Sequence, residues 1–284
     1  MTTTSFFAHR QRLVSVFKDT MEQIQQSQDC QEAISYSLSQ QQFISHEQPI
    51  DLPEMKYDTP AEIRVSRLRS FEAAAQYQGQ HVAVLNFASA TSPGGGVEKG
   101  ASAQEEALCR VSTLFPCLKD KTMWESFYAP HRKTGDALHN DDVIYTPRVL
   151  VIKDDDLNLL PTPFYVDVIT CAAPNLRDKP SNSYNPGDKI KASISDEDLL
   201  ALHEQRAKKI LAAAVKNGAE VLILGAFGCG AFKNDPHIVA QAYKNMLPSF
   251  CHYFRIIEFA VYCRAKDAKN YEAFCPLADI QREA

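Results

Sequence analysis

Short apolar runs alternate along this chain with stretches in which apolar residues recur at helical spacing. The runs are rich in β-branched and aromatic side chains and predict buried strands at residues 82–87, 164–173, 221–224 and 254–263. Helical spacing follows the first run at Ala107, Leu108, Val111, Leu114 and Phe115. It returns over residues 198–217, closed by Gly218, and in a helix opened by Asp235 and Pro236. Strands that alternate with helices predict an α/β fold with a largely parallel or mixed sheet.

Other parts of the chain are less regular. Residues 1–50 are rich in Gln and Ser but contain a helical stretch, so we expect residues 1–60 to form an N-terminal helical extension packed on a main domain of residues 61–284. Apolar positions over residues 63–75 predict another helix. Residues 119–142 are polar and aromatic and predict a long surface excursion. Pro147 interrupts an apolar run and favours an edge strand or two short strands.

Two glycine-rich loops each connect a predicted strand to a predicted helix. The first contains Gly94, Gly95 and Gly96, and a capping box of Ser102 and Glu105 marks the start of the helix that follows it. The second has the sequence GAFGCGAF at residues 225–232. Free backbone N–H groups near a helix N-terminus bind anions, and ligands of such sheets bind outside the carboxyl ends of the strands. We therefore expect a ligand site at these two loops.

Neither loop matches a common nucleotide-binding motif. Gly95 and Gly100 have the spacing of a P-loop, but Ala101 stands where the lysine is required. The glycines of the second loop have the reverse of the dinucleotide-binding spacing, and no acidic residue follows at the required distance. These departures argue against an NTPase and against a hydride-transferring enzyme.

Composition and charge further limit the possible ligands and the possible location of the protein. The chain has 284 residues, of which 45% are hydrophobic, and a formal net charge of −5 without a polybasic tract. This composition suits a folded core and gives no strong signal for nucleic acid or for a membrane. The eight cysteines form no CxxC pair, so we expect free thiols in a reducing, cytoplasmic location, or in the nucleus of a eukaryotic host. The eight histidines have no ligand spacing with acids or cysteines, so we expect no metal, and we expect a monomer.

A resemblance to a known family predicts a more specific function for these loops. The string LNFASATSPGGGV, the later QEE, CAAPN and LGAFGCGAFKND occur in this order between residues 64 and 260. Together they resemble the macrodomain fold and, more narrowly, the bacterial-type (microbial) poly(ADP-ribose) glycohydrolase family. The resemblance implies a three-layer α/β/α arrangement with a mixed central sheet, poly(ADP-ribose) or ADP-ribosylated protein as substrate, and no cofactor.

The resemblance also assigns roles to individual residues. The first loop would approach the distal ribose with Gly94, Gly95, Gly96 and Val97. The second loop would bind the diphosphate with Gly228, Cys229, Gly230, Ala231 and Phe232, Phe232 also packing against the ribose unless it only caps the sheet. Asn86 and Ser89 are candidate ribose contacts. Glu106 would be the catalytic acid, Glu105 would contact the ribose, and Gln104 would orient the pair.

Several alternatives remain open at this point. Successive helix positions are about 100° apart, so we expect Glu105 and Glu106 to point in different directions. Burial would raise the pKa of Glu106 and the helix N-terminus would lower it, and the sequence does not decide between them. The leading hypothesis is hydrolysis of poly(ADP-ribose) with release of ADP-ribose. The alternatives are a hydrolase of mono(ADP-ribose) linked to protein or nucleic acid, and an ADP-ribose-binding module without turnover.

Overall fold

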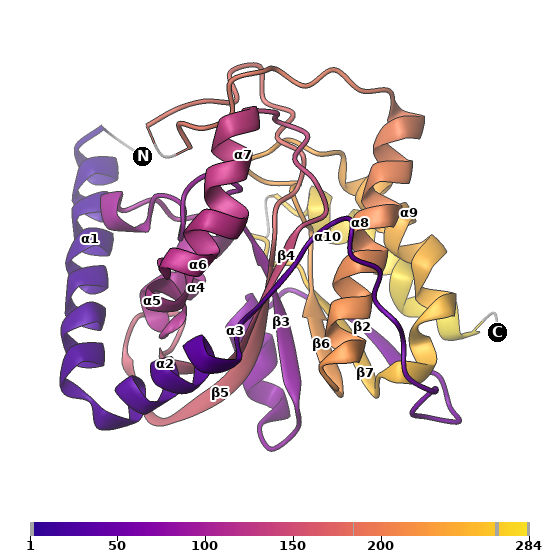
Figure 1. Ribbon diagram of the computed structural model, residues 1–284, viewed down its shortest axis with the longest axis horizontal. Helices are drawn as coiled ribbons and strands as arrows, with labels where there is room; N and C mark the ends of the chain where they lie inside the picture. The colour runs from indigo at the N-terminus through magenta and orange to yellow at the C-terminus, as the bar shows by residue number, and fades with distance from the viewer. Residues whose placement is uncertain (1–2, 184, 265–266, 283–284) are drawn as a thin grey trace.

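A single mixed β-sheet forms the centre of the molecule (Figure 1). The computed structural model describes residues 3–183, 185–264 and 267–282. In these residues the strand order is β1–β4–β5–β3–β6–β7–β2. The strands are β1 (Gln42–Ile44), β2 (Glu62–Ser66), β3 (Val82–Phe87), β4 (Val143–Lys153), β5 (Leu159–Cys171), β6 (Val221–Leu224) and β7 (Ile256–Ala260). β4 is antiparallel to both of its neighbours and the other pairs are parallel, so the predicted α/β class with a mixed sheet is confirmed.

Helices cover both faces of the sheet, as Figure 1 shows. The helices are α1 (Thr3–Gln26), α2 (Gln28–Gln40), α3 (Ser70–Ala74), α4 (Gln104–Val111), α5 (Leu114–Leu118), α6 (Lys121–Met123), α7 (Ala129–Thr134), α8 (Asp196–Lys216), α9 (Pro236–Met246) and α10 (Lys269–Phe274). Short 3-10 segments are η1 (Ala75–Tyr77), η2 (Val97–Lys99), η4 (Leu247–Ser249), η5 (Cys251–Tyr253) and η6 (Cys275–Arg282), and η3 (Trp124–Tyr128) is a π-helical turn.

Alternating side chains of the central strands build two separate cores. Val82 and Val84 of β3 pack with α3, α4 and α5 on one face. Ala83 and Leu85 pack with α8, α9 and α10 on the other face. This alternation is the strand period of two, and it explains why the central strands are apolar without interruption.

Residues 63–75 were predicted as one helix, and the first part of that prediction is wrong. Residues 62–66 form β2, which pairs with β7 at the end of the sheet, and the helix begins only at Ser70. Ile63 and Val65 are β-branched residues two positions apart, and both pack toward the same core. Pairing with β7 therefore outweighs the helical spacing.

The stretch predicted as a surface excursion is instead mostly helical and partly buried. Residues 121–134 form α6, η3 and α7, and Phe127 and Tyr128 are fully buried. The aromatic side chains thus supply core contacts that the polar composition of the stretch concealed. At Pro147, β4 continues as one strand between β1 and β5, with a register shift between Thr146 and Val149. A bulge places the missing N–H of proline outside the regular ladder.

The N-terminal helices pack against the region of the first glycine loop. Phe17 of α1 meets the Phe115 ring at 5.0 Å, and the Thr20 hydroxyl donates to the Arg110 carbonyl of α4 at 2.7 Å. The Arg10 side chain donates to the Lys99 carbonyl at 2.6 Å. The division at residue 60 stays a prediction, and these contacts brace α4 from outside.

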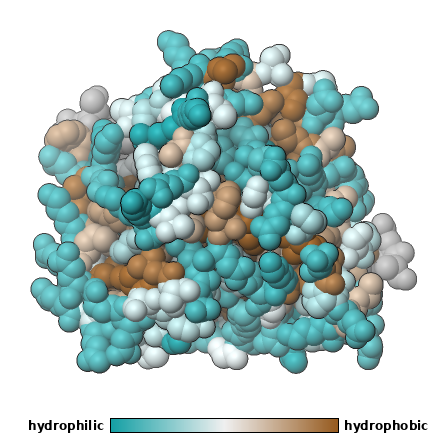
Figure 2. Space-filling view, viewed as in Figure 1, coloured by the Kyte–Doolittle hydropathy of each residue, from teal (hydrophilic) through white to brown (hydrophobic). Residues whose placement is uncertain are grey.

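The face of the molecule in Figure 2 is largely hydrophilic, with separate hydrophobic patches. Among the residues described, none of the helices combines the length and apolarity that a membrane crossing requires.

Candidate functional site

Three adjacent parallel strands end at the same edge of the sheet and position the candidate site. They are β5, β3 and β6, in this order. The first glycine loop follows β3, and the second follows β6 and leads into α9. Parallel neighbours place their carboxyl ends together, and this edge is where ligands of α/β sheets bind. Both predicted loops therefore lie at one edge.

The first loop brings both glutamate carboxylates to Gly95. Gly94 and Gly95 have φ angles of +67° and +57°, which glycine adopts without strain. A Cβ at Gly95 would lie 2.4 Å from Glu106 Oε1 and 3.1 Å from Glu105 Oε2. The expectation that the two glutamates point in different directions is therefore wrong. Their side chains are long enough to converge on the loop despite the helical rotation between their Cα atoms.

Glu105 is 3% exposed and both of its oxygens have partners. The Ser89 N–H donates to Oε2 at 2.8 Å, and the Asn86 amide donates to Oε1 at 3.5 Å. The predicted capping box is wrong, because α4 begins at Gln104 after Ala103 and the Glu105 side chain turns inward toward β3. Burial, followed by the negative charge of Glu106, raises the pKa of Glu105 well above its usual value.

Glu106 differs from Glu105 in having one oxygen without a partner. It is 7% exposed, and the Gly96 N–H donates to Oε1 at 2.8 Å. Oε2 is buried and makes no hydrogen bond to the described part of the chain. Burial raises the pKa of Glu106, although the Gly96 N–H and the Arg110 charge act in the opposite direction. Burial therefore outweighs the helix N-terminus, which the sequence left open.

Gln104 fixes the first turn of α4 to the end of β3. Its amide oxygen accepts from the Phe87 N–H at 2.9 Å, and its amide nitrogen donates to the Leu85 carbonyl at 2.8 Å and to Ser70 Oγ at 2.9 Å. It makes no hydrogen bond to either glutamate. Any orienting effect on the pair therefore acts through the position of the helix.

The remaining residues predicted for the ribose lie around the carboxylates. Asn86 is fully buried, donates to Thr170 Oγ1 at 3.2 Å, and has an Oδ1 without a partner in the described residues. The Ser89 hydroxyl donates to Asn185 Oδ1 at 2.8 Å. Val97 is completely buried in the core below α4, and its N–H donates within the loop to the Gly94 carbonyl. Val97 is therefore a packing residue of the loop.

The second loop presents several free N–H groups. Gly228 has a φ of +78°, and a Cβ there would lie 2.6 Å from both Ala173 and Asn234. The N–H groups of Gly230 and Ala231 donate to no other group in the described chain, and both residues are exposed. The half-buried Phe232 lies 6.1 Å from His139, measured between ring centroids. Backbone amides of this kind form anion sites.

Cys229 of the second loop has the properties of a packing residue. Its thiol is half-buried and lies 3.6 Å from the Phe227 carbonyl. Burial, followed by the charge of Asp235, raises the pKa of Cys229 to about 12. A thiol with this pKa is neutral near pH 7 and is a poor nucleophile.

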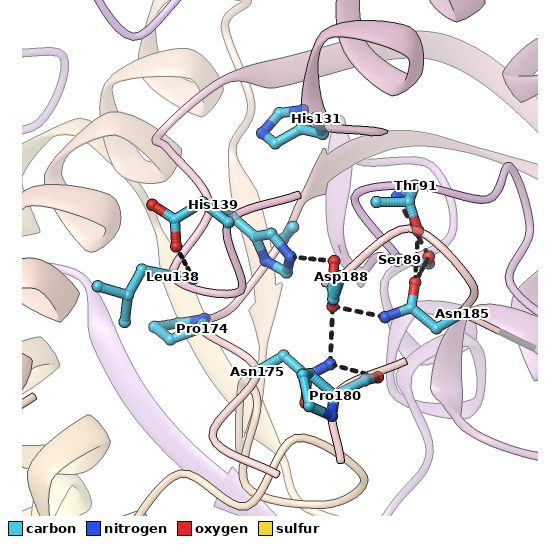
Figure 3. A network of polar contacts seen from close by, with 12 residues as sticks. Ser89, Thr91, His131, Leu138, His139, Pro174, Asn175, Pro180, Asn185 and Asp188 are labelled. Carbon is cyan, nitrogen blue, oxygen red and sulfur yellow. Dashed lines mark hydrogen bonds and ion pairs between the residues drawn. The ribbon is translucent and has the colours of Figure 1, made fainter. Parts of the chain in front are cut away.

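A buried polar network that sequence reasoning missed joins the first loop to residues 175–188 (Figure 3). Asp188 is at its centre and accepts from His139 Nε2 at 3.0 Å, Asn175 Nδ2 at 2.7 Å and Asn185 Nδ2 at 2.6 Å. Asn185 in turn accepts from Ser89. Burial acts to raise the pKa of Asp188, but these hydrogen bonds and the His139 charge together lower it. The only feature of the sequence that pointed to this network was the Asn- and Pro-rich composition of the loop that contains Asn185 and Asp188.

The pKa of Glu105 leads to a prediction on stability. Because its folded-state pKa is raised, ionisation of Glu105 costs stability as the pH rises above its unfolded value of about 4.3. Glu105→Gln is therefore expected to raise the melting temperature at about pH 8, with a gain that shrinks toward about pH 5. A pKa that differs by one between the folded and unfolded states changes the free energy of unfolding by about 1.4 kcal/mol, which moves the melting temperature of a chain of this size by about 2–4 °C. The glutamine can still accept from Ser89 and can donate to the free Oδ1 of Asn86.

Thermal unfolding of Glu105→Gln and wild type between about pH 5 and pH 8 measures this effect. Glu125→Gln is the matched control, because the Glu125 side chain is 62% exposed. We expect that control to show no pH-dependent difference. A larger loss of stability in Glu105→Gln at the higher pH would contradict the prediction.

The fold and the paired carboxylates define an α/β enzyme with a macrodomain-like architecture. A family model described as the catalytic domain of microbial-type PARG, poly(ADP-ribose) glycohydrolase, matches residues 11–154. The poly(ADP-ribose) glycohydrolase of Thermomonospora curvata is 31% identical with a TM-score of 0.79, covering 93% of this chain and 98% of its own. That of Deinococcus radiodurans, in complex with ADP-ribose, is 30% identical with a TM-score of 0.72, covering 88% of this chain and 97% of its own.

No match was found among curated protein sequences. The family match and the solved structures nevertheless agree, and the chain belongs to the microbial-type poly(ADP-ribose) glycohydrolase family. The predicted family, fold class and enzyme class are thereby confirmed.

Proposed function

We propose that this enzyme hydrolyses the ribose–ribose O-glycosidic bonds of poly(ADP-ribose) and releases ADP-ribose, with Glu106 as general acid and then general base. The observation that carries this proposal is the state of Glu106. Its carboxyl is buried, its pKa is raised, and its Oε2 lacks a partner in the described chain. A general acid must hold a proton near the working pH, and a raised pKa acts in this direction.

The two loops are suited to bind different parts of the substrate. The exposed amides of Gly230 and Ala231 suit the diphosphate, and Phe232 suits the adjoining ribose. The distal ribose would then lie at Gly94–Gly96 and Asn86, whose Oδ1 is unpaired. A relative from Thermomonospora curvata binds the inhibitor ADP-HPD, and that of Deinococcus radiodurans binds ADP-ribose, in structures 29% and 30% identical to this chain.

The reaction would proceed with one proton passing through Glu106. Protonated Glu106 donates to the glycosidic oxygen while the bond from this oxygen to the anomeric carbon breaks, and an oxocarbenium-like centre develops. The polymer leaves with a new hydroxyl. A water then adds to the anomeric carbon and gives its proton to the Glu106 carboxylate, which restores the acid. The family resemblance implies that the substrate diphosphate positions this water.

Glu105 would contribute in a different way. Its two oxygens accept from Ser89 and Asn86, so it is a fixed acceptor next to the acid. A ribose hydroxyl bound at this position would donate to it.

A turnover panel tests the proposed function. The purified chain is incubated with poly(ADP-ribose), with Ser-, Glu- and Arg-linked mono(ADP-ribosyl) peptides, and with ADP-ribose alone, and free ADP-ribose is measured by chromatography. We expect release from the polymer. Release only from one of the peptides would assign a mono(ADP-ribosyl) hydrolase, and binding of ADP-ribose without release from any substrate would assign a binding module. Monomeric state and cytoplasmic location stay predictions.

A further inference from the structure

A cavity lies against the first glycine loop. It has a volume of about 450 Å³, and Gly95 and Gly96 form part of its wall. The N–H of Gly96 donates to Glu106 Oε1, so the same backbone segment contacts both the cavity and the candidate acid. Cavities of about 300–1,000 Å³ are typical of small-molecule sites. This cavity can hold a nucleotide-sized part of a ligand.

Among the described residues, three cations line this cavity, namely Lys99, Lys119 and Arg132, together with one carboxylate, Glu98. The cavity thus has a surplus of positive charge in a chain whose formal net charge is −5. A concave surface with one sign of charge attracts a ligand of the opposite sign.

Arg132 is held in place from two sides. Its Nε donates to the Thr91 carbonyl at 2.5 Å, and its guanidinium lies 4.9 Å from the centre of the Trp124 ring. An arginine that is already ordered loses little side-chain entropy when it binds a phosphate. This contact also links the cavity wall to the loop that carries Ser89.

The two lysines are less constrained and remain accessible. Lys119 Nζ lies 3.6 Å from Glu98 Oε1, and both side chains are more than half exposed, so this ion pair is weak. Lys99 Nζ donates to the Ser183 carbonyl at 2.6 Å, which leaves two of its three donors for a ligand.

We propose that this cavity binds the diphosphate of the polymer unit on the leaving side of the scissile bond. The inference rests on the proposed function, in which the reacting unit occupies the two glycine loops and the next unit must leave past residues 94–96. Lys99, Lys119 and Arg132 then contact the next diphosphate and hold the leaving unit during cleavage. The cavity thereby favours polymer over substrates whose leaving group lacks phosphate.

The test compares two substrates across charge variants. One substrate is poly(ADP-ribose), and the other is ADP-ribose joined through its anomeric carbon to a small neutral alcohol. The Lys99→Gln/Lys119→Gln variant is expected to lower kcat/KM on the polymer about 3- to 10-fold, since exposed charge contacts contribute about 0.2–1 kcal/mol each. On the small substrate its kcat/KM should stay within about 2-fold of wild type. Lys119→Gln alone is the second variant, because the Lys119 side chain makes no hydrogen bond to the backbone of the described residues, whereas Lys99 donates to the Ser183 carbonyl.

Two further variants sharpen the test. Lys121→Gln is the matched control, because it removes the same charge two residues from Lys119 on a side chain that is 85% exposed and outside the cavity wall. It should act like wild type on both substrates. Glu98→Gln removes the competing carboxylate and should raise kcat/KM on the polymer about 2-fold.

The outcomes separate the two proposals. Equal losses on both substrates, or no loss on the polymer, would overturn the leaving-side site while the proposed function stands. A wild-type chain that cleaves neither substrate would overturn the proposed function and this inference with it. A selective loss on the polymer that Lys121→Gln does not share supports the site.

Discussion

Glu106→Gln is expected to lower kcat on poly(ADP-ribose) about 100- to 10,000-fold, which is the usual contribution of a general acid. Glutamine keeps the size of the side chain and can still accept the Gly96 N–H at the position of Oε1. It cannot donate and then recover a proton. Affinity for ADP-ribose should change only about 3-fold, because the lost interaction belongs to the transition state.

Single-turnover release of ADP-ribose and calorimetric binding of ADP-ribose measure the two quantities separately. Glu125→Gln is the control for loss of a carboxylate, since Glu125 is exposed on η3 and pairs with Lys121. Full activity in Glu106→Gln would remove Glu106 from the catalytic role. A large loss of binding instead of kcat would make it a binding residue.

The pH dependence of kcat/KM follows from the same group. Burial raises the pKa of Glu106, so protonated Glu106 persists above the usual titration range of a glutamate. The activity should therefore decline on the alkaline side as this carboxyl ionises, and Glu106→Gln should not show that limb.

The order of strands and helices was predictable because each element has its own local signal. β3 and β6 are each an apolar run followed by a glycine loop. The pair Asp235 and Pro236 marks the start of α9. Residues 63–66 were predicted as helix because both the helical and the strand periodicity fit so short a segment. The choice between them depends on β7, which lies almost 200 residues later in the chain.

The sequence predicted that the candidate residues of the first loop lie together, but it predicted less of their geometry. The motif placed Glu105, Glu106 and the glycines in one loop–helix unit, and the structure brings them together. The convergence of the two carboxylates depends on side-chain rotamers, which follow from the packing around Asn86 and Ser89. The Asp188 network was not predictable, because its members come from separate loops whose composition resembles that of any polar turn.

Gly95→Ala is expected to reduce kcat at least about 100-fold, the scale of a 1 Å displacement of a catalytic group. The new methyl group would lie 2.4 Å from Glu106 Oε1 and 3.1 Å from Glu105 Oε2. No real Cβ tolerates the shorter contact, so either the loop or the carboxylate must move. The Gly96 N–H bond to Glu106 would be stretched or lost, and the unpaired Oε2 would no longer keep its position.

The comparison with Gly79→Ala isolates this collision from backbone strain. Gly79 has a φ of +90°, but a Cβ there would meet no atom within 4 Å. Both substitutions force alanine into a left-handed conformation, which costs about 1–2 kcal/mol of stability. Only Gly95→Ala should also lose activity, as measured by ADP-ribose release at a temperature where both variants are folded. Similar kcat values for the two variants would show that the positions of the carboxylates do not limit the reaction. A selective loss in Gly95→Ala would mean that the absence of a side chain at Gly95 leaves the room that the Glu106 carboxyl needs.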